Sequence, residues 1–403
     1  MNIIFLTLLD FQSYSEHNIY CDLLRELIRQ GHQVYCISPA EKRTGIETHW
    51  EENGHLLKLK IGNTQKTNLV EKGVSTLMLE PQFVSAIKQY FANIKFDLVL
   101  YSTPPITLAG AVKYIKKRDG AQTYLMLKDI FPQNAVDLGM MTTTGVKGLL
   151  YGYFRQKEKA LYRLSDRIGC MSPANVAFLL QHNPEVTPAK VGICPNCIEV
   201  RDMGLTVQER AKMREKYAIP QDKKVFVYGG NLGKPQGIPF ILDCLRKLAD
   251  DPDAYFLIVG DGTEYGKLEQ YIRESAPRNV KLIKRLPRED YDKMIAACDV
   301  GLIFLDHRFT IPNFPSRLLS YMQARLPVIC ATDPNTDIGA IAGENGFGWW
   351  CESNDPDRFA QLVRMVCTED LEPCGDAAWD YLCKHYSVRK VCEQLTAVNK
   401  VAL

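Results

Sequence analysis

With 403 residues, the chain is too long for one ordinary hydrophobic core, so two domains of about 200 residues each are expected. Hydrophobic residues make up 46% and charged residues 24%, which is the composition of a soluble globular protein, and a formal net charge of +2 gives no indication of a nucleic-acid partner. No apolar run approaches the roughly 18 residues that a membrane span requires, so we expect a cytoplasmic protein.

The first half of the chain alternates short apolar runs with helical periodicity. A helix over 15–30 is predicted after the first strand, because Ile19, Leu23 and Leu27 recur at every fourth position and Gly31 suits a C-terminal cap. Repeated β-α-β units of this kind predict a parallel sheet that is covered on both faces. The predicted strands are residues 3–9, 34–38, 96–103, 121–129, 166–172 and 190–196.

The second half repeats the same α/β pattern after a charged, strand-poor stretch, which places a domain junction near 198–222. We expect two Rossmann-like domains, at residues 1–200 and 201–380, and a C-terminal helix at 381–403 that packs back on the first domain. Ligands of such domains bind at the C-terminal ends of the strands. The predicted strands are residues 225–230, 254–262, 280–286, 299–306, 327–333 and 348–353.

A glycine-rich turn follows strand 225–230 and precedes a helix that begins near Ile238. Its residues are Gly229, Gly230, Asn231, Leu232, Gly233 and Lys234. The turn is not a Walker A motif, because Pro235 follows the lysine, and it is not GxGxxG. Backbone N–H groups and the helix N-terminus could still face a phosphate there, with Lys234 adding a full charge. A structural tight turn with a solvated lysine explains the same residues equally well.

A second helix start in the same half lies in PSRLLSYMQA, residues 315–324. Ser316 is a candidate N-cap, and Arg317 falls in the first turn. A cation at this end of a helix is unfavourable unless an anion offsets it. Two such anion sites in one domain indicate a nucleoside diphosphate.

These motifs carry a family resemblance. The segments YGGNLGKPQG, IVGDG, NFPSRLLSYMQARLPVI and TDIG resemble the donor domain of the family-4 glycosyltransferases, which have the GT-B fold and retain the configuration of the transferred sugar. Upstream, SEHNIYCDLLRELIRQGHQV, LKDIFPQNAVDLGMM and IGCMSPANVAFLLQHNPE extend the resemblance over nearly the whole chain. The subgroup that the chain resembles builds capsule and O-antigen repeat units. The resemblance therefore implies a glycosyltransferase that takes a sugar, expected to be UDP-linked, to a lipid-linked sugar acceptor, without a cofactor.

The resemblance also implies which residues hold the donor. The glycine turn and residues 316–317 would bind the diphosphate, and residues 285–286 would receive the nucleobase. The implied donor-binding residues are Gly229, Gly230, Asn231, Gly233, Lys234, Gly260, Asp261, Arg285, Leu286, Ser316, Arg317 and Ser320. One departure matters, because the family has a pair of glutamates with seven residues between them, and this chain has Pro312 and Ser320 there. Ribose recognition would need the Ser320 hydroxyl or another residue.

Catalysis by this set needs no metal ion. Lys234, Arg317 and helix N-terminal amides can stabilise a leaving diphosphate electrostatically. Metal-dependent glycosyltransferases use Asp-x-Asp instead, and two such patterns occur here, at 251–253 and 355–357. Each contains a central proline in a polar turn, so we interpret both as turns or helix caps.

The acceptor residues are expected in the first domain. Asp129 ends strand 121–129 and could orient or deprotonate an acceptor hydroxyl, although a cap next to Pro132 explains it equally well. Glu16 and His17 follow the first strand and could line the same site, with a turn role somewhat favoured for His17. In a retaining reaction the departing phosphate could itself accept the proton.

Residues 146–167 predict a basic amphipathic helix that suits an anionic membrane surface, although a helix packed on its own sheet is an even alternative. With a polyprenyl-diphosphate-linked acceptor, the membrane interpretation predicts a peripheral location at the inner face of the plasma membrane. The basic residues are Lys147, Arg155, Lys157, Lys159, Arg163 and Arg167. Two other functions stay open, a nucleotide-sugar 2-epimerase on the same fold and a non-catalytic nucleotide-sugar-binding protein.

Overall fold

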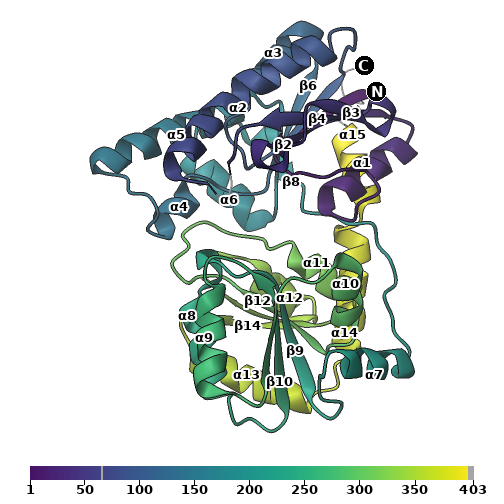
Figure 1. Cartoon of the computed structure of the whole chain (residues 1–403), viewed down its shortest axis with the longest axis vertical. Helices are drawn as coiled ribbons and strands as arrows, with labels where there is room; N and C mark the ends of the chain where they lie inside the picture. Colours follow the sequence, from purple (N-terminus) through teal and green to yellow (C-terminus); the bar gives the residue numbers. More distant parts are fainter. Residues whose placement is uncertain (65–66, 398–403) are drawn as a thin grey trace. The chain divides into compact units, whose positions relative to one another are not determined.

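The computed structural model describes residues 1–64 and 67–397 and divides into two compact units (Figure 1). The first unit comprises Met1–Glu199 together with Val388–Leu403, and the second comprises Val200–Ser387. The segment that returns to the first unit begins at Val388 rather than at residue 381, because α14 (Glu372–His385) packs against α11 (Arg317–Gln323) within the second unit. Among the helices of the described residues, none is both long enough and apolar enough to cross a membrane.

The first unit is built on an eight-stranded sheet in the order β3-β4-β2-β1-β5-β6-β7-β8. Its pairs are parallel except β3 with β4, which is antiparallel, so the predicted parallel sheet carries an antiparallel edge. All six predicted strands are present, and β3 and β4 are additional. The strands are β1 (Asn2–Leu6), β2 (Gln33–Glu41), β3 (His49–Glu51), β4 (Leu56–Ile61), β5 (Leu98–Ser102), β6 (Gln122–Leu127), β7 (Arg167–Cys170) and β8 (Val191–Ile193).

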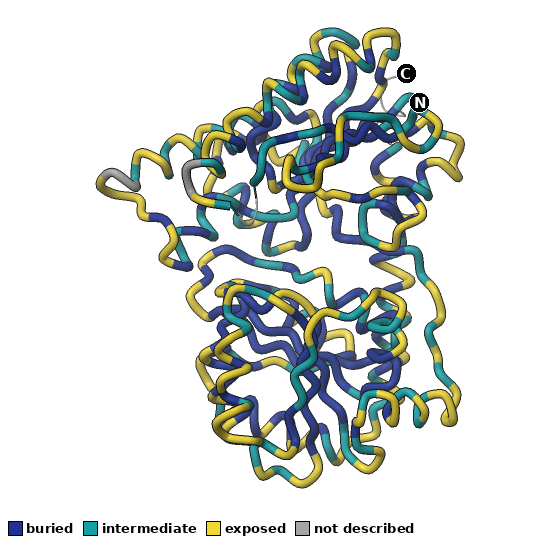
Figure 2. The backbone as a smooth tube through the Cα atoms, viewed as in Figure 1, coloured by how far each residue is buried: buried dark blue, intermediate teal, exposed yellow. Residues whose placement is uncertain are grey.

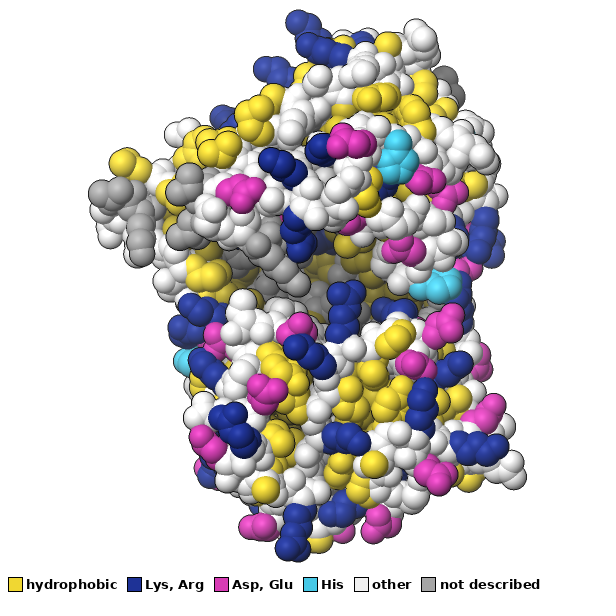
Figure 3. Space-filling model, in the orientation of Figure 1, with side chains coloured by type: hydrophobic (Ala, Val, Ile, Leu, Met, Phe, Trp, Pro, Cys, Tyr) yellow, Lys and Arg dark blue, Asp and Glu magenta, His cyan; other side chains and the backbone are white. Residues whose placement is uncertain are grey.

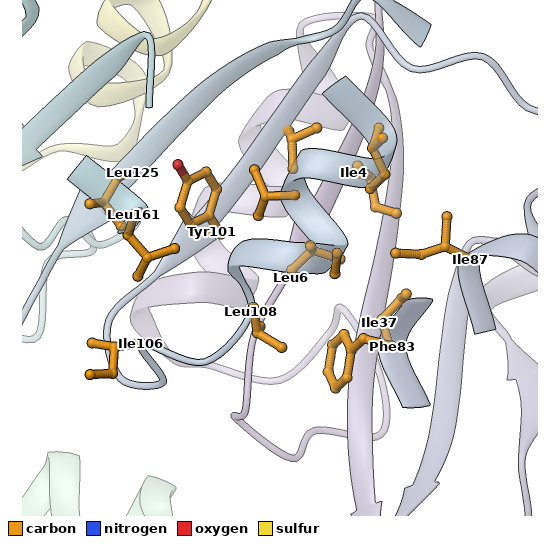
Figure 4. Packing of buried hydrophobic residues seen from close by; sticks show 14 of the residues in the cluster. Ile4, Leu6, Ile37, Phe83, Ile87, Tyr101, Ile106, Leu108, Leu125 and Leu161 are labelled. Carbon is orange, nitrogen blue, oxygen red and sulfur yellow. The ribbon is translucent and has the colours of Figure 1, made fainter. Parts of the chain in front are cut away.

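Helices cover both faces of this sheet. Ile4 and Leu6 of β1 join a core with α2, α3 and α5, part of which is drawn in Figure 4, whereas Ile3 and Phe5 join a core with α1 and α15. This alternation buries β1 on both faces, as its continuous apolar run predicts. The helices are α1 (Ile19–Arg29), α2 (Leu69–Tyr90), α3 (Ala109–Asp119), α4 (Gln133–Asp137), α5 (Gly145–Leu164), α6 (Pro173–His182) and α15 (Val388–Thr396).

Helix α1 starts four residues later than predicted. The side chain of Asn18 accepts hydrogen bonds from the amides of Tyr20 and Cys21 and so caps the helix. Residues 15–18 therefore belong to the loop between β1 and α1.

The second unit has a six-stranded parallel sheet in the order β11-β10-β9-β12-β13-β14. Every predicted strand is present, although the one predicted at 280–286 ends at Ile283. The strands are β9 (Lys224–Asn231), β10 (Ala254–Asp261), β11 (Val280–Ile283), β12 (Val300–Phe304), β13 (Val328–Thr332) and β14 (Gly348–Glu352).

Helices α8, α9 and α13 pack on one face of this sheet, and α10, α11 and α14 lie on the other (Figure 1). The strands are buried along most of their length, whereas the connecting loops are exposed (Figure 2). The remaining helices are α7 (Val207–Lys216), α8 (Ile238–Lys247), α9 (Tyr265–Ser275), α10 (Arg288–Ala296), α12 (Ile338–Glu344) and α13 (Pro356–Thr368). The strand order reverses between β9 and β12, and a sheet of this type binds ligands at the C-terminal ends of the strands at such a reversal.

Candidate active site

The glycine turn lies at the C-terminal end of β9, beside this reversal. Gly230 has a φ of +133°, which strongly favours glycine. A Cβ atom on Gly230 would also lie 3.4 Å from the guanidinium group of Arg317, and one on Gly260 of β10 would overlap the Gly230 carbonyl oxygen. The two glycines therefore let β9, β10 and the start of α11 approach one point. The glycine turn and the Arg317 helix start, predicted separately, are in contact.

The backbone amides of the turn are partly occupied. Three of them donate within the protein, from Gly229 to Tyr321 Oη (3.0 Å), from Leu232 to the Asp261 carbonyl (3.0 Å) and from Gly233 to Gln236 Oε1 (3.1 Å). We expected several N–H groups of the turn to face a phosphate, and for these three that expectation is wrong. Side-chain cations therefore have a larger share in the positive character of the site than the turn alone predicts.

Arg317 is the principal cation beside the turn. Its guanidinium carbon lies 4.2 Å from the ring centroid of Tyr228, a cation–π contact. Its Nη1 atom is buried without a hydrogen-bond partner, and in the described part of the chain no carboxylate lies within ion-pair distance of it. A polar atom that is buried without a partner is costly, and this one belongs to a charged group. A bound anion would supply the missing partner.

Two further tyrosines complete the surroundings of Arg317. The hydroxyl of Tyr291, on α10, lies so close over Gly229 that a Cβ atom there would overlap it. Tyr321, on α11, donates its hydroxyl to the Leu302 carbonyl at 3.2 Å. Burial raises the pKa of both tyrosines, so both stay neutral donors at physiological pH. Sequence reasoning missed this group, because its members come from β9, α10 and α11 and share no motif.

Lys234 lies in a short 3₁₀ turn, Lys234–Gln236, and is exposed. The amide of Asp306, just after β12, donates to the Pro235 carbonyl at 2.9 Å and fixes this turn against the next strand of the sheet. The Asn231 side chain points back into the turn and donates to Gln236 Oε1 at 3.1 Å. The backbone around Lys234 is therefore held, while its charged end is accessible to solvent.

Ser316 does not cap α11 as predicted. It occupies the N-cap position, but its dihedral angles are helical (φ −64°, ψ −16°) and its side chain makes no capping hydrogen bond. Ser316 is exposed, and Ser320, one turn later, lies 3.5 Å from Arg288 Nη2 through its Oγ atom. Pro312 is buried. Arg288 and Ser320 together are therefore the polar groups nearest to one of the two missing glutamate positions.

The residues expected near the nucleobase lie further along the sheet edge. Asp261 is paired in register with Asn231, and its Oδ1 accepts from the Gly262 amide at 2.9 Å. Arg285 and Leu286 follow the end of β11, an edge strand that β10 separates from β9. Arg285 is exposed and Leu286 is half-buried, so the structure does not bring them into the group around Arg317.

Both Asp-x-Asp patterns are structural, as predicted. Asp251 Oδ1 accepts from the amides of Asp253 and Ala254 at 3.2 and 3.3 Å, in a turn before β10. Asp355 caps α13 by accepting from the Arg358 amide at 2.9 Å.

In the first unit, Asp129 follows β6 at the C-terminal edge of the sheet. Both of its carboxylate oxygens accept from Asn134 Nδ2 at 2.9 Å. Burial raises the pKa of Asp129 to about 6, so it can gain or lose a proton near neutral pH. The hydrogen bonds with Asn134 fit the interpretation of Asp129 as a structural residue. A pKa close to neutral pH fits its interpretation as a catalytic base.

Glu16 and His17 lie in the loop after β1, at the same edge of the sheet, with β5 between β1 and β6. Both are exposed, and Glu16 Oε1 accepts from the Gln12 amide at 2.6 Å. His17 lies 3.2 Å from Arg25 Nη2 through its Nδ1 atom. Exposure and position both suit the predicted acceptor side.

One group of metal-ligand types is present near this loop. Ligand atoms of His17, Asp22 and Glu199 lie within 4.8 Å of one another. The Arg25 guanidinium donates to both carboxylates, so a cation already occupies the centre of the group. The arrangement is an ion-pair network that joins α1 to residue 199.

Comparison with known proteins agrees with this architecture. Residues 18–202 match the family model described as Glycosyltransferase Family 4, and residues 209–376 match the one described as Glycosyl transferases group 1. A Pseudomonas aeruginosa protein named as a glycosyltransferase, WbjE, is 26% identical over 330 residues, covering 81% of this chain and 80% of the relative. An Escherichia coli protein named as a colanic acid biosynthesis glycosyl transferase, WcaI, is 22% identical over 251 residues, covering 61% of this chain and 60% of the relative. The crystal structure of HepE from Anabaena in complex with UDP covers 100% of both chains with a TM-score of 0.69 at 15% identity.

Proposed function

We propose a specific reaction for this chain, which belongs to the GT-B glycosyltransferases with a Family 4 and a group 1 domain. The reaction is transfer of a sugar from a UDP-sugar to a lipid-linked sugar acceptor, in the synthesis of a surface polysaccharide. It retains the configuration of the sugar and uses no metal ion. Relatives named for polysaccharide biosynthesis and a similar fold solved with UDP support the acceptor class and the nucleotide.

The observation that carries this proposal is the unpartnered Nη1 atom of the Arg317 guanidinium group beside Gly230. The group lies at the C-terminal end of β9, is packed on Tyr228 and has a buried Nη1 without a partner. A diphosphate oxygen at this point would accept the missing charge-assisted hydrogen bond. The Ser316 hydroxyl and Lys234, which are exposed on the flanking segments, are the next contacts we propose for the same diphosphate.

The proposed chemistry follows from the charge that develops as the sugar leaves. Breaking the bond to the anomeric carbon places negative charge on the diphosphate, and fixed cations stabilise that charge more in the transition state than in the bound donor. Arg317 and Lys234 perform this role. Asp129, or the departing phosphate itself, accepts the proton of the acceptor hydroxyl.

The basic residues of α5 suggested a membrane partner, but their charges are not what supports it now. Most described cations of α5 are engaged, Arg155 with Glu158 at 2.5 Å, Lys159 with Glu185 at 3.0 Å and Lys157 with Glu80 at 3.7 Å. The side chain of Lys147 lies outside the described residues.

Exposed apolar side chains on α5 now carry the membrane proposal. Leu149 is 76% exposed and Leu150 50%, with Tyr153 next to them on the helix. Hydrophobic side chains are also visible at the surface over the helices of the first unit in Figure 3. Such residues insert between lipid headgroups. We therefore propose binding at the inner face of the plasma membrane through insertion more than through charge.

The test is product analysis with a panel of UDP- and GDP-sugars, with and without a polyprenyl diphosphate that carries one N-acetylglucosamine. Net transfer to the acceptor from a UDP-sugar supports the proposal. An altered sugar without acceptor would indicate the 2-epimerase, and nucleotide binding without any product would indicate the non-catalytic alternative. For the membrane, sedimentation with anionic vesicles should fall when Leu149 and Leu150 are both changed to Asp, and equal sedimentation would contradict the insertion.

A further inference from the structure

The loop between β1 and α1 is held in one conformation by side chains from neighbouring strands. Ser38 Oγ, on β2, accepts from the Phe11 amide at 3.2 Å and donates to the Leu9 carbonyl at 2.9 Å. Glu52 Oε1 accepts from the Tyr14 amide at 2.8 Å. A loop fixed in this way at the C-terminal edge of a parallel sheet presents its side chains in defined positions, as a substrate site requires.

The centre of this arrangement is a buried lysine. Lys58, on β4, has 0% of its side chain exposed. Its Nζ donates to Asp10 Oδ1, to the Phe11 carbonyl at 2.8 Å and to Ser38 Oγ at 3.2 Å. Burying a cation is costly unless it is paired, and Asp10 is the carboxylate with which Lys58 pairs. An apolar residue at position 58 would cost less free energy to bury in β4. The presence of a lysine therefore indicates that its charge holds Asp10 in place.

The carboxylate of Asp10 is only partly engaged in hydrogen bonds. Its side chain is 44% exposed, while Lys58 beneath it is fully buried. Oδ1 accepts from Lys58 and from Gln12 Nε2 at 3.2 Å. Oδ2 has no hydrogen-bond partner within the residues that the structure describes. The carboxylate is therefore fixed through one oxygen and open through the other, four residues after the end of β1, the strand next to β5.

We propose that Asp10 binds a hydroxyl group of the acceptor sugar through Oδ2, and that Lys58 is a positioning residue that holds this carboxylate in its orientation. The inference rests on the proposed function, because an acceptor hydroxyl exists only if the chain transfers a sugar. A carboxylate repels a diphosphate and accepts readily from a neutral hydroxyl, so we expect Asp10 to contact the sugar of the acceptor and not its diphosphate. Sequence reasoning passed over Asp10, because nothing near it in the chain indicates its buried partner.

The experiment compares Asp10→Asn, Lys58→Met and the double variant. Asparagine keeps the volume and the Oδ1 acceptor but puts an amide donor at the Oδ2 position. It also removes the charge that pairs with the buried Lys58, so a loss of thermal stability is expected beside the kinetic effect, and the double variant, which removes both charges, should recover part of it. Acceptor kcat/KM should fall about 10- to 150-fold, the value of one hydrogen bond to a charged group, with polyprenyl-diphosphate N-acetylglucosamine as the probe. The thermal shift with UDP should equal that of the wild type.

Lys58→Met should also lower the acceptor kcat/KM, through a higher KM. The double variant should lose no more acceptor kcat/KM than the worse single variant, because the two residues act as one unit. The control is Asp97→Asn, which changes an exposed carboxylate before β5, at the opposite edge of the same sheet, and should keep the wild-type KM.

The outcomes are distinguishable. If the wild type transfers sugar and Asp10→Asn does so with unchanged kcat/KM, this inference is overturned and the proposed function stands. If the wild type forms no glycoside with any donor of the panel, the proposed function fails and the inference fails with it. A Lys58→Met variant that loses thermal stability but keeps the acceptor KM would overturn the positioning role alone.

Discussion

Replacing Arg317 with methionine should separate ligand binding from fold stability. The change keeps most of the side-chain stem and removes the charge and the five N–H donors. A buried polar group without a partner costs about 1–3 kcal/mol, and Nη1 of Arg317 is such a group. The cation–π contact with Tyr228, which the variant loses, contributes about 0.5–2 kcal/mol. With the middle of each range the unliganded variant should be about 1 kcal/mol more stable than the wild type, and the extremes run from about 1 kcal/mol less to about 2.5 kcal/mol more stable.

Binding of UDP should change in the opposite direction. A hydrogen bond to a charged group contributes about 1.5–3 kcal/mol, so losing one weakens the Kd roughly 10- to 150-fold. Isothermal titration calorimetry measures this Kd, and differential scanning calorimetry without ligand measures the stability. One kcal/mol corresponds to roughly 2–4 °C in Tm for a domain of this size, so the Tm should be a few degrees higher at the middle of these ranges.

Arg325→Met is the matched control. Arg325 also stacks on an aromatic ring, with its guanidinium carbon 4.7 Å from the Trp379 centroid, but it pairs with Asp376 at 2.6 Å. Its replacement should lower the Tm slightly and leave UDP binding unchanged. If Arg317→Met instead lowers the Tm by several degrees and binds UDP like the wild type, then Arg317 is a structural residue and the reasoning is refuted.

Three further changes test neighbouring claims. Gly230→Ala should destabilise the protein by about 1–2 kcal/mol and weaken UDP binding, because the residue has a positive φ and faces the Arg317 guanidinium. Gly266→Ala is the control: a Cβ atom there meets nothing within 4 Å and the residue lies in α9, so this variant should be as stable as the wild type or up to about 1 kcal/mol more stable and should bind UDP equally well. Equal behaviour of the two variants would contradict this. Lys234→Ala should reduce the thermal shift with UDP with little loss of stability, because the residue is exposed, and an equal shift would remove it from the site. The folded pKa of Asp129, about 6, lies above the unfolded value of about 3.9, so the contribution of this carboxyl group to the free energy of unfolding is present below about pH 4 and is lost as pH rises through 6. Asp129→Asn should therefore make the stability measured by denaturant unfolding less dependent on pH across that window. A pH dependence parallel to that of the wild type would refute the burial argument.

The fold was predictable wherever strands are buried on both faces. Such strands are continuous apolar runs, and β1, β5, β6 and the central strands of the second unit, β10, β12 and β13, follow this pattern. Strand β4 was missed because Lys58 and Lys60 interrupt its apolar run in LLKLKI. The burial of Lys58 depends on Asp10, 48 residues earlier, and no local pattern predicts a partner at that separation.

The candidate site was predictable in part for the same reason. The glycine turn and the helix start at Arg317 are local motifs, and the sheet order that brings them together follows from repeated β-α-β units. The tyrosines around Arg317 and the internal partners of the amides depend on packing between distant segments. Tyr321 illustrates this, since its hydroxyl accepts from Gly229, 92 residues earlier.

The occupied amides change the kind of phosphate recognition that this site should show. Where loop amides bind phosphate, recognition rests on dipoles that salt screens weakly. Here three amides of the turn are engaged internally, and one of the two cations, Lys234, is exposed. Interactions of exposed charges weaken with ionic strength, since the screening length falls from about 10 Å at 0.1 M salt to about 3 Å at 1 M. Affinity for UDP should therefore fall with salt, and Lys234→Ala should reduce that dependence while Arg317→Met, which removes a half-buried cation, should reduce it less. Calorimetric titration of UDP at several salt concentrations measures these slopes. A wild-type Kd that does not change with salt would mean that backbone dipoles, and not these two side chains, hold the diphosphate.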